Sequence, residues 1–361
     1  MKPLRVDAHN GAPVWGGAEI ALARIVAGLA RRGHDVLLHC NDPEVERNAA
    51  ALGAPTRRGR LGGDIALHHA ARFARTLRRR RPDALLLGTF RKVWLGALAG
   101  RLAGVPRVVA RIGLETDMPR NAKYAFVLGR WVDAVAFNAD VMRVRFARAL
   151  PAFRGALVTI HTGVPVPSGP PGAAAALRRE IGVAPDAPVI GSVGRLASQK
   201  RYDLLVAALP SLPGVHALIL GEGPEREALR SLARELGVAE RLHLPGHRED
   251  VGPGLGAMDV FVLCSDREGM SNAMLEALAA GVPVVSTDVS GAREALAPVE
   301  DAGTPGVVLA APEDLVPAVR ALLADPARLA AMGDAARRAA RARFGEERML
   351  DDWERLLGGD G

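Results

Sequence analysis

Short apolar runs alternate with longer segments rich in Ala, Leu and Arg along the whole chain, and this alternation limits the fold more than any other feature. Such runs separated by helical patterns, for example at 18–32 and 64–81, are typical of parallel sheets covered on both faces. We therefore predict an α/β fold with doubly wound, Rossmann-like sheets. The expected strands are residues 4–9, 35–40, 84–88, 107–112, 134–137, 157–160, 189–193, 217–220, 241–244, 260–263, 282–286 and 306–309.

The chain has 361 residues, more than one hydrophobic core usually supports, so we expect two domains. A segment rich in Pro and Gly at 164–172 cannot form a helix or a central strand and is interpreted as a linker. The predicted domains are residues 1–165 and 166–343, facing each other across a cleft. In such folds ligands bind at the carboxyl ends of the strands. The final helical segment, 344–361, is expected to pack back on the first domain.

Several features favour a cytoplasmic protein. No apolar run reaches the ~18 residues that a membrane span needs, and the N-terminus reads as a strand and not as a signal peptide. The two cysteines, Cys40 and Cys264, each end an apolar run, so buried thiols are expected and not a disulfide.

Charge is unevenly distributed along the chain. Residues 1–165 contain 27 Lys and Arg and 12 Asp and Glu, which gives a net charge of +15. Residues 166–361 contain 20 Lys and Arg and 28 Asp and Glu, which gives a net charge of −8. One interpretation is that a basic helix docks on an anionic membrane surface, which would place the protein peripherally at the inner face of the membrane. The other is a solvated helix end whose cations suit the helix dipole. Aromatic residues are too scarce here for a nucleic-acid partner. The arginines concerned are Arg72, Arg75, Arg78, Arg79, Arg80 and Arg81.

The segment from Cys264 to Ser286 carries the strongest functional signal. A polar loop with Glu268 follows a buried strand, and Ser271 or Asn272 can cap a helix that Gly281 and Pro283 end. Amides at a helix start attract phosphate. A glutamate fixed on the helix suits vicinal hydroxyls such as those of a ribose, and a loop-borne glutamate suits a sugar. The alternative is an ordinary capped helix with solvated glutamates.

Two further loops contain phosphate-binding residue types. Arg195 and Lys200 follow the expected strand 189–193 and offer a guanidinium fork and a point charge; a solvated turn is the alternative. Gly16 and Gly17 precede a helix and permit close approach of backbone to a phosphate or sugar. Gly-Glu-Gly-Pro at 221–224 reads as a strand-to-helix turn.

Together these motifs resemble the retaining GT-B glycosyltransferases of family 4. The resemblance rests on the order of Gly-Gly-Ala-Glu at 16–19, Gly-Arg-x4-Lys at 194–200, Gly-Glu-Gly-Pro at 221–224, Leu-Pro-Gly-His-Arg-Glu-Asp at 244–250 and Glu-x7-Glu at 268–276. It covers nearly the whole chain and implies two Rossmann-like domains facing across a cleft. It also implies transfer of a hexose from a nucleotide-diphosphate sugar, with a uridine donor as a guess from frequency.

The resemblance also implies individual roles. Catalysis is assigned to Glu268, Arg195 and Lys200, the two cations offsetting charge on the leaving diphosphate. Glu276 would hold the ribose hydroxyls. The other implied donor-binding residues are Gly16, Gly17, His247, Arg248, Gly269, Met270, Ser271 and Asn272.

The family retains anomeric configuration by a front-face route that needs no divalent metal and no cofactor, and the chain contains no Asp-x-Asp. The implied acceptor is a glycan or a lipid-linked glycan in cell-envelope polysaccharide or lipopolysaccharide synthesis.

One departure from the family lies after the expected strand 107–112, where many relatives carry a His. The candidates for the acceptor side are Arg111, Glu115 and Asp117, with His9 at the mouth of the first strand. Two other functions stay open: a nucleotide-sugar epimerase on the same scaffold, and a non-catalytic sugar-nucleotide-binding subunit.

Overall fold

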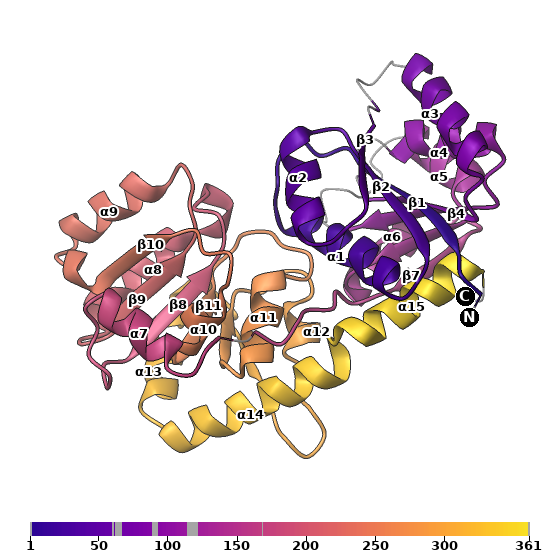
Figure 1. Cartoon of the computed structure of the whole chain (residues 1–361). Coiled ribbons are helices and arrows are strands. Elements are labelled where there is room, and N and C mark those ends of the chain that lie inside the picture. The colour runs from indigo at the N-terminus through magenta and orange to yellow at the C-terminus, as the bar shows by residue number, and fades with distance from the viewer. Residues whose placement is uncertain are drawn as a thin grey trace. The chain divides into compact units, whose positions relative to one another are not determined.

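A computed structural model of the chain describes residues 2–59, 61, 67–88, 93–113, 122–167 and 169–359. The chain forms two compact units, which Figure 1 colours from indigo to yellow along the sequence. One unit combines Met1–Gly163 with Glu346–Gly361, and the other is Val164–Gly345. Both are α/β units built on a parallel sheet, so the predicted fold class is confirmed.

The first unit has a seven-stranded parallel sheet with the order β3-β2-β1-β4-β5-β6-β7. Its strands are β1 (Arg5–Asn10), β2 (Asp35–Cys40), β3 (Thr56–Arg58), β4 (Ala84–Leu87), β5 (Arg107–Ile112), β6 (Ala134–Phe137) and β7 (Ala156–Thr159). Its helices are α1 (Gly17–Arg31), α2 (Pro43–Ala51), α3 (Leu67–Arg80), α4 (Val93–Ala103), α5 (Ala122–Trp131), α6 (Asp140–Ala149) and α15 (Glu346–Gly358).

The second unit has a six-stranded parallel sheet with the order β10-β9-β8-β11-β12-β13. Its strands are β8 (Val189–Val193), β9 (His216–Leu220), β10 (Leu242–Gly246), β11 (Val260–Leu263), β12 (Val284–Ser286) and β13 (Gly306–Val308). Its helices are α7 (Ala173–Glu180), α8 (Tyr202–Ala208), α9 (Arg226–Glu235), α10 (Gly252–Gly256), α11 (Asn272–Ala280), α12 (Ala292–Ala295), α13 (Leu315–Leu323) and α14 (Pro326–Arg343), with short 3₁₀ turns such as η3 (Ser198–Lys200).

Every strand expected from the sequence is present, and one further strand, β3, was not expected. Its residues Thr56, Arg57 and Arg58 are polar and largely exposed at the edge of the sheet. An edge strand with no apolar face gives no periodic signal, which is why the sequence did not reveal it.

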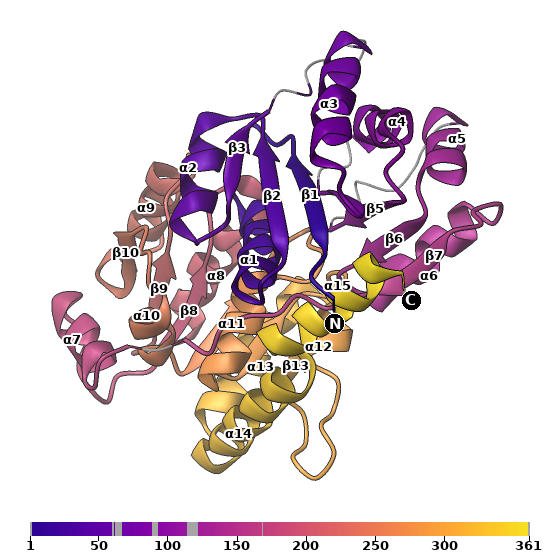
Figure 2. The same cartoon turned by 45° about the vertical axis from the view of Figure 1, so that its right-hand side comes forward.

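The helix α15 completes the core of the first unit, although it follows the whole of the second unit in sequence. Met349, Trp353 and Leu357 are buried in the same cluster as the apolar side of α1, and Figure 2 shows α15 beside the start of β1. At Gly28 in α1 an added Cβ would lie 2.5 Å from Leu350, so glycine permits the two helices to pack closely.

Polar contacts also attach α15 to the segment that follows α1. Arg32 binds Asp351 and Glu354, and His34 Nε2 lies 3.1 Å from Glu354 Oε1. The Nδ1 atom of His34 accepts a hydrogen bond from the Leu4 amide, so Nε2 is the nitrogen that donates to Glu354. Burial alone would raise the pKa of Glu354, but hydrogen bonds from Arg32 and His34 lower it.

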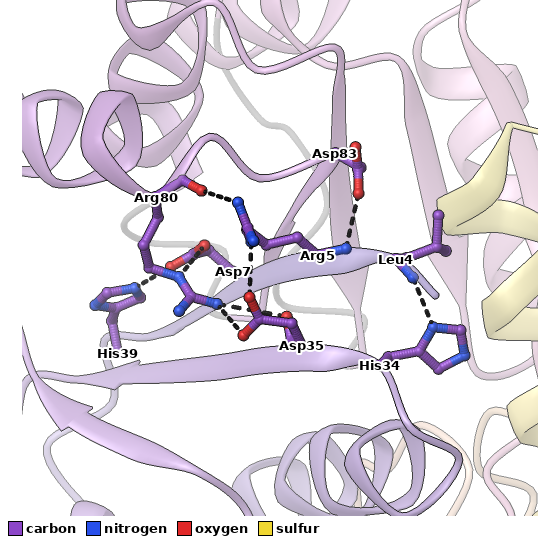
Figure 3. A network of polar contacts seen from close by, with 8 residues as sticks. All are labelled: Leu4, Arg5, Asp7, His34, Asp35, His39, Arg80 and Asp83. Carbon is purple, nitrogen blue, oxygen red and sulfur yellow. Dashed lines mark hydrogen bonds and ion pairs between the residues drawn. The ribbon is translucent and has the colours of Figure 1, made fainter. Parts of the chain in front are cut away.

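The basic helix α3 is tied to the sheet through its last turn (Figure 3). Arg80 Nε donates to the fully buried carboxylate of Asp7 at 2.9 Å, and Asp7 also lies 2.5 Å from His39 Nε2. Arg80 binds Asp35 as well, and Arg78 donates to the carbonyl of Leu102. Arg80 is thus engaged by a buried carboxylate and Arg78 by a helix-end carbonyl, and nothing in the described part of the structure supports docking of these arginines on a membrane surface. Arg60, just before this helix in sequence, lies outside the described residues.

Among the described helices, none is long and apolar enough to span a bilayer. Cys40 and Cys264 are both buried thiols, as expected.

Candidate functional site

The neighbouring strands β8 and β11 bring two sequence-distant loops together. They pair in parallel, with Ile190 opposite Val260 and Gly191 opposite Phe261. Their carboxyl ends therefore lie at the same edge of the sheet, where ligands bind in open α/β folds. The segment 194–200 leaves β8 at this edge, and the segment 264–271 leaves β11.

An ion pair joins these two loops. Lys200 Nζ lies 2.5 Å from Glu268 Oε1, and the hydroxyl of Ser265 donates to the same oxygen at 2.9 Å. The two charged side chains are 21% and 11% exposed, so each depends on the other for compensation of its charge. The sequence motifs point to Lys200 and Glu268 separately. No motif indicates their direct contact or the role of Ser265, because both depend on which strands are neighbours in the sheet.

Arg195 leaves the same strand end but behaves differently. Its side chain is exposed, and within the described parts of the chain it makes no ion pair. The loop thus carries one exposed cation, Arg195, and one paired cation, Lys200. Cations of this kind suit a polyanionic ligand.

Backbone packing fixes the start of this loop. Gly221, which follows β9, has a φ of +153°, and an added Cβ would lie 1.9 Å from the carbonyl oxygen of Gly194. The amide of Gly194 donates to Leu220 at 2.9 Å, and the amide of Leu196 donates to Glu222 at 2.9 Å. The Gly-Glu-Gly-Pro segment therefore supports the loop that carries Arg195 and Lys200.

The helix α11 begins and ends as its sequence predicts. Ser271 is its N-cap, and the hydroxyl accepts from the amide of Met274 at 3.5 Å. Gly281 ends the helix in the left-handed conformation, with φ 79°. Met270 and Ser271 are buried, Gly269 precedes them in the same loop, and Glu276 is half-buried within the helix. The N-terminal amides of α11, including that of Asn272, follow directly on the loop of Glu268.

The predicted base-pocket residues lie farther along the sheet edge. His247 and Arg248 follow β10, which is two strands from β8. His247 is exposed, and Arg248 pairs with Glu180 at the end of α7. This ion pair borders a surface hollow of about 530 Å³ between α7 and α10 that Asp250 also lines. The structure thus brings Lys200 and Glu268 together but turns Arg248 towards α7.

The first unit places its candidates at the ends of β1 and β5. Gly16 is the N-cap of α1, and Gly17 is the first helical residue. Arg111 is 6% exposed, and its Nη1 atom lies 3.4 Å from the carbonyl of Ala18. A buried guanidinium therefore adds positive charge beside the start of α1, where helix dipoles favour anions.

His9 is held inside the first unit. It is 2% exposed, and its Nε2 lies 3.1 Å from Asn41 Oδ1 while its ring contacts Phe73. Asn41 donates through Nδ2 to Leu61, so its oxygen faces His9 and accepts the Nε2 hydrogen. Glu115 and Asp117 lie outside the described residues.

In the described part of the chain, no group of three or more His, Cys, Asp or Glu side chains is arranged to hold a metal ion.

Comparisons with known proteins bear on the family of the chain and on its fold. Residues 174–339 match the family described as Glycosyl transferases group 1, and residues 16–149 match the Glycosyl transferase 4-like domain. The chain is 36% identical over 290 residues to the GDP-mannose-dependent alpha-(1-6)-phosphatidylinositol monomannoside mannosyltransferase of Mycolicibacterium smegmatis, covering 73% of this chain and 72% of that protein.

Two further relatives are informative. The lipopolysaccharide core biosynthesis glycosyltransferase LpsE of Rhizobium meliloti is 43% identical over 114 residues, which is 32% of this chain and only 34% of LpsE. The crystal structure of HepE from Anabaena in complex with UDP has a TM-score of 0.84 at 20% identity, covering 99% of this chain and 100% of HepE. This last likeness shows a common fold.

Proposed function

Because the chain belongs to the family 4 glycosyltransferases with the GT-B fold and is a glycosyltransferase, we propose that it transfers a hexose from a nucleotide-diphosphate sugar to a glycan or lipid-linked acceptor. The observation that carries this proposal is the contact between Lys200 and Glu268 at the adjoining ends of β8 and β11. At this contact a cation that can bind a diphosphate lies next to a carboxylate that can bind sugar hydroxyls.

In the proposed donor site, Lys200 and Arg195 bind the diphosphate and stabilise the charge that grows on it as the glycosidic bond breaks. Glu268 and the amides from Gly269 to Asn272 hold the sugar. Glu276 holds the ribose. The family resemblance assigns Gly17 to the phosphates and His247 to the base, whereas Arg248 would have to leave Glu180 to contact the base.

The proposed reaction retains anomeric configuration and needs neither a metal nor a cofactor. Support comes from the family resemblance, from the lack of an Asp-x-Asp motif, and from Arg195 and Lys200, whose positive charge could stabilise a leaving diphosphate as a metal ion does in other transferases. We propose a uridine donor, which the UDP complex of HepE supports. The GDP-mannose dependence of the mycobacterial relative makes guanosine the second candidate.

The proposed acceptor is a cell-envelope glycolipid or glycan. LpsE takes part in lipopolysaccharide core synthesis, and the mycobacterial relative acts on a phosphatidylinositol mannoside. Both names describe saccharides carried on membrane lipids. Both matched family models describe glycosyl transferases, so the epimerase alternative is not carried further.

The test is a screen of donors followed by a coupled assay. Calorimetric titration with UDP-glucose, UDP-N-acetylglucosamine and GDP-mannose identifies the donor. That donor is then incubated with and without lipopolysaccharide core oligosaccharide or phosphatidylinositol mannoside. We expect nucleoside diphosphate release only with an acceptor, an unchanged rate in EDTA, and a product with the donor's anomeric configuration by NMR. Isomerised nucleotide sugar formed without an acceptor would contradict the proposal.

A further inference from the structure

Arg201 has a backbone conformation that few side-chain-bearing residues adopt. Its φ is 49° and its ψ is 41°, and it directly follows Lys200. In the described residues, the other non-glycine positions with positive φ are Arg81 and Asp301. Left-handed backbone at such a residue is strained, and it persists where surrounding contacts hold it.

Contacts of the guanidinium hold Arg201 in place. Nε lies 3.1 Å and 3.2 Å from the two carboxylate oxygens of Asp203, and Nη2 lies 3.0 Å from Asp203 Oδ2. Nη1 reaches across to Asp266 Oδ1 at 3.1 Å. Asp203 belongs to the first turn of α8, whereas Asp266 belongs to the loop after β11. The guanidinium therefore links the β8 side of the site to the β11 side.

Further bonds join the same two segments on either side. The amide of Asp266 donates to the carbonyl of Gln199 at 3.0 Å, and Gln199 Nε2 donates to the carbonyl of Arg267 at 2.7 Å. Residues 199–201 and 266–268 thus contact each other at three consecutive positions, with Lys200 and Glu268 as one of the contacts. This set of bonds therefore lies on both sides of the contact between Lys200 and Glu268.

We propose that Arg201 is a positioning residue of the donor site: its bridge to Asp266 sets where Lys200 stands relative to Glu268 and so aims the Lys200 ammonium at the donor's second phosphate. This inference rests on the proposed function of Lys200 as a diphosphate ligand. The bridge is partly exposed, at 36% for Arg201 and 52% for Asp266. Exposed ion pairs contribute little to folding stability, whereas small displacements of a binding group change affinity strongly.

The variants below separate the effect of the Arg201 guanidinium from the effect of the left-handed backbone at the same residue. Arg201→Gly keeps a residue suited to positive φ but removes the bridge, and Asp266→Ala removes the bridge from the other loop. Arg201→Lys restores a cation. Arg230→Ala is the control, because Arg230 forms an exposed ion pair with Glu227 on α9. Binding is measured calorimetrically with UDP and UMP, and with GDP and GMP, since only the diphosphates reach Lys200 if it binds the second phosphate.

For the nucleoside diphosphate that binds more tightly, we expect about a tenfold loss of affinity in Arg201→Gly and in Asp266→Ala, as for one misplaced charge-assisted hydrogen bond. Affinity for the monophosphate and the thermal unfolding midpoint stay unchanged in both variants. The double variant loses no more diphosphate affinity than either single variant, and Arg201→Lys recovers part of the lost affinity. Arg230→Ala matches the wild type throughout.

Two results would overturn the inference in distinguishable ways. If Lys200→Ala lowers diphosphate affinity but Arg201→Gly keeps the ratio of diphosphate to monophosphate affinity, the positioning role fails and the donor site stands. If Lys200→Ala also keeps that ratio, or neither diphosphate binds the wild type, the proposed donor site fails, and the role of Arg201 fails with it.

Discussion

Lys200 Nζ lies 2.5 Å from Glu268 Oε1, although 68 residues separate the two in sequence. The contact exists because β8 and β11 are neighbours in a parallel sheet, although α8, β9, α9, β10 and α10 lie between them along the chain. Each side chain compensates the other's charge in a partly buried setting. A polyanionic donor that binds here would draw Lys200 towards phosphate and leave Glu268 for sugar hydroxyls.

Substitution of either partner tests this site in the transfer assay. Lys200→Ala and Glu268→Gln should each lower kcat/KM by about 10²–10³-fold, as when one preorganised electrostatic group is removed from an active site. Initial rates of nucleoside diphosphate release with the identified donor and acceptor provide the measurement. Arg230→Ala serves as the control, because it breaks an exposed ion pair with Glu227 on α9. Wild-type rates in both site variants would rule out the proposed roles.

Much of this architecture was predictable because the determining signals are local. The apolar runs of β5 and β11, the cap at Ser271 and the stop at Gly281 are each specified within a few residues. Contacts across the sheet edge were not predictable. Nothing within the segment 198–203 indicates that Arg201 reaches Asp266, because that contact depends on which strands pair.

The direction in which long side chains point could not be predicted from the sequence either. The run of arginines at the end of α3 suggested a uniform cationic surface, but Arg80 turns inward to Asp7, a residue 73 positions earlier. The residues next to a buried carboxylate in a strand do not indicate which distant side chain will pair with it.

Stability should decline in mild acid because of a histidine pair in the second unit. His216 Nδ1 and His243 Nε2 lie 2.9 Å apart. Burial lowers the pKa of His243 from 6.5 to about 4 and also lowers the pKa of His216. Between pH 6.5 and 4 the unfolded chain therefore binds protons that the folded chain does not, so stability is lost as the pH falls through this range.

The check is a comparison of thermal unfolding midpoints at pH 7 and pH 5. We expect a smaller drop in His243→Gln than in the wild type. His68→Gln, which alters an exposed histidine of α3, should show the wild-type drop. An identical drop in all three proteins would assign the acid sensitivity to other groups.

Both thiols should resist alkylation in the folded protein. Burial raises the pKa of Cys40 and of Cys264 to about 12 in each case, and the thiolate is the reactive form. Mass spectrometry after iodoacetamide treatment at pH 8 should find no label in native protein and two labels after denaturation in guanidinium chloride. Rapid labelling of native protein at either cysteine would contradict the burial described above.

Loss of the Trp353 side chain should destabilise the first unit. Trp353 is 2% exposed in the core that α15 completes, and truncating such a residue to Ala costs about 3–5 kcal/mol. Chemical denaturation measures the loss. Arg355→Ala on the exposed side of the same helix should change the unfolding free energy by less than about 0.5 kcal/mol. Equal effects of the two variants would show that α15 does not contribute to the core.

The placement of α15 also bears on how the chain folds as it is synthesised. The ribosome adds Trp353, Leu356 and Leu357 only after it has synthesised the whole of Val164–Gly345. The second unit can therefore fold on the nascent chain while the earlier-made first unit still exposes the apolar side of α1. We expect that surface to be the part of the newborn chain that chaperones protect longest.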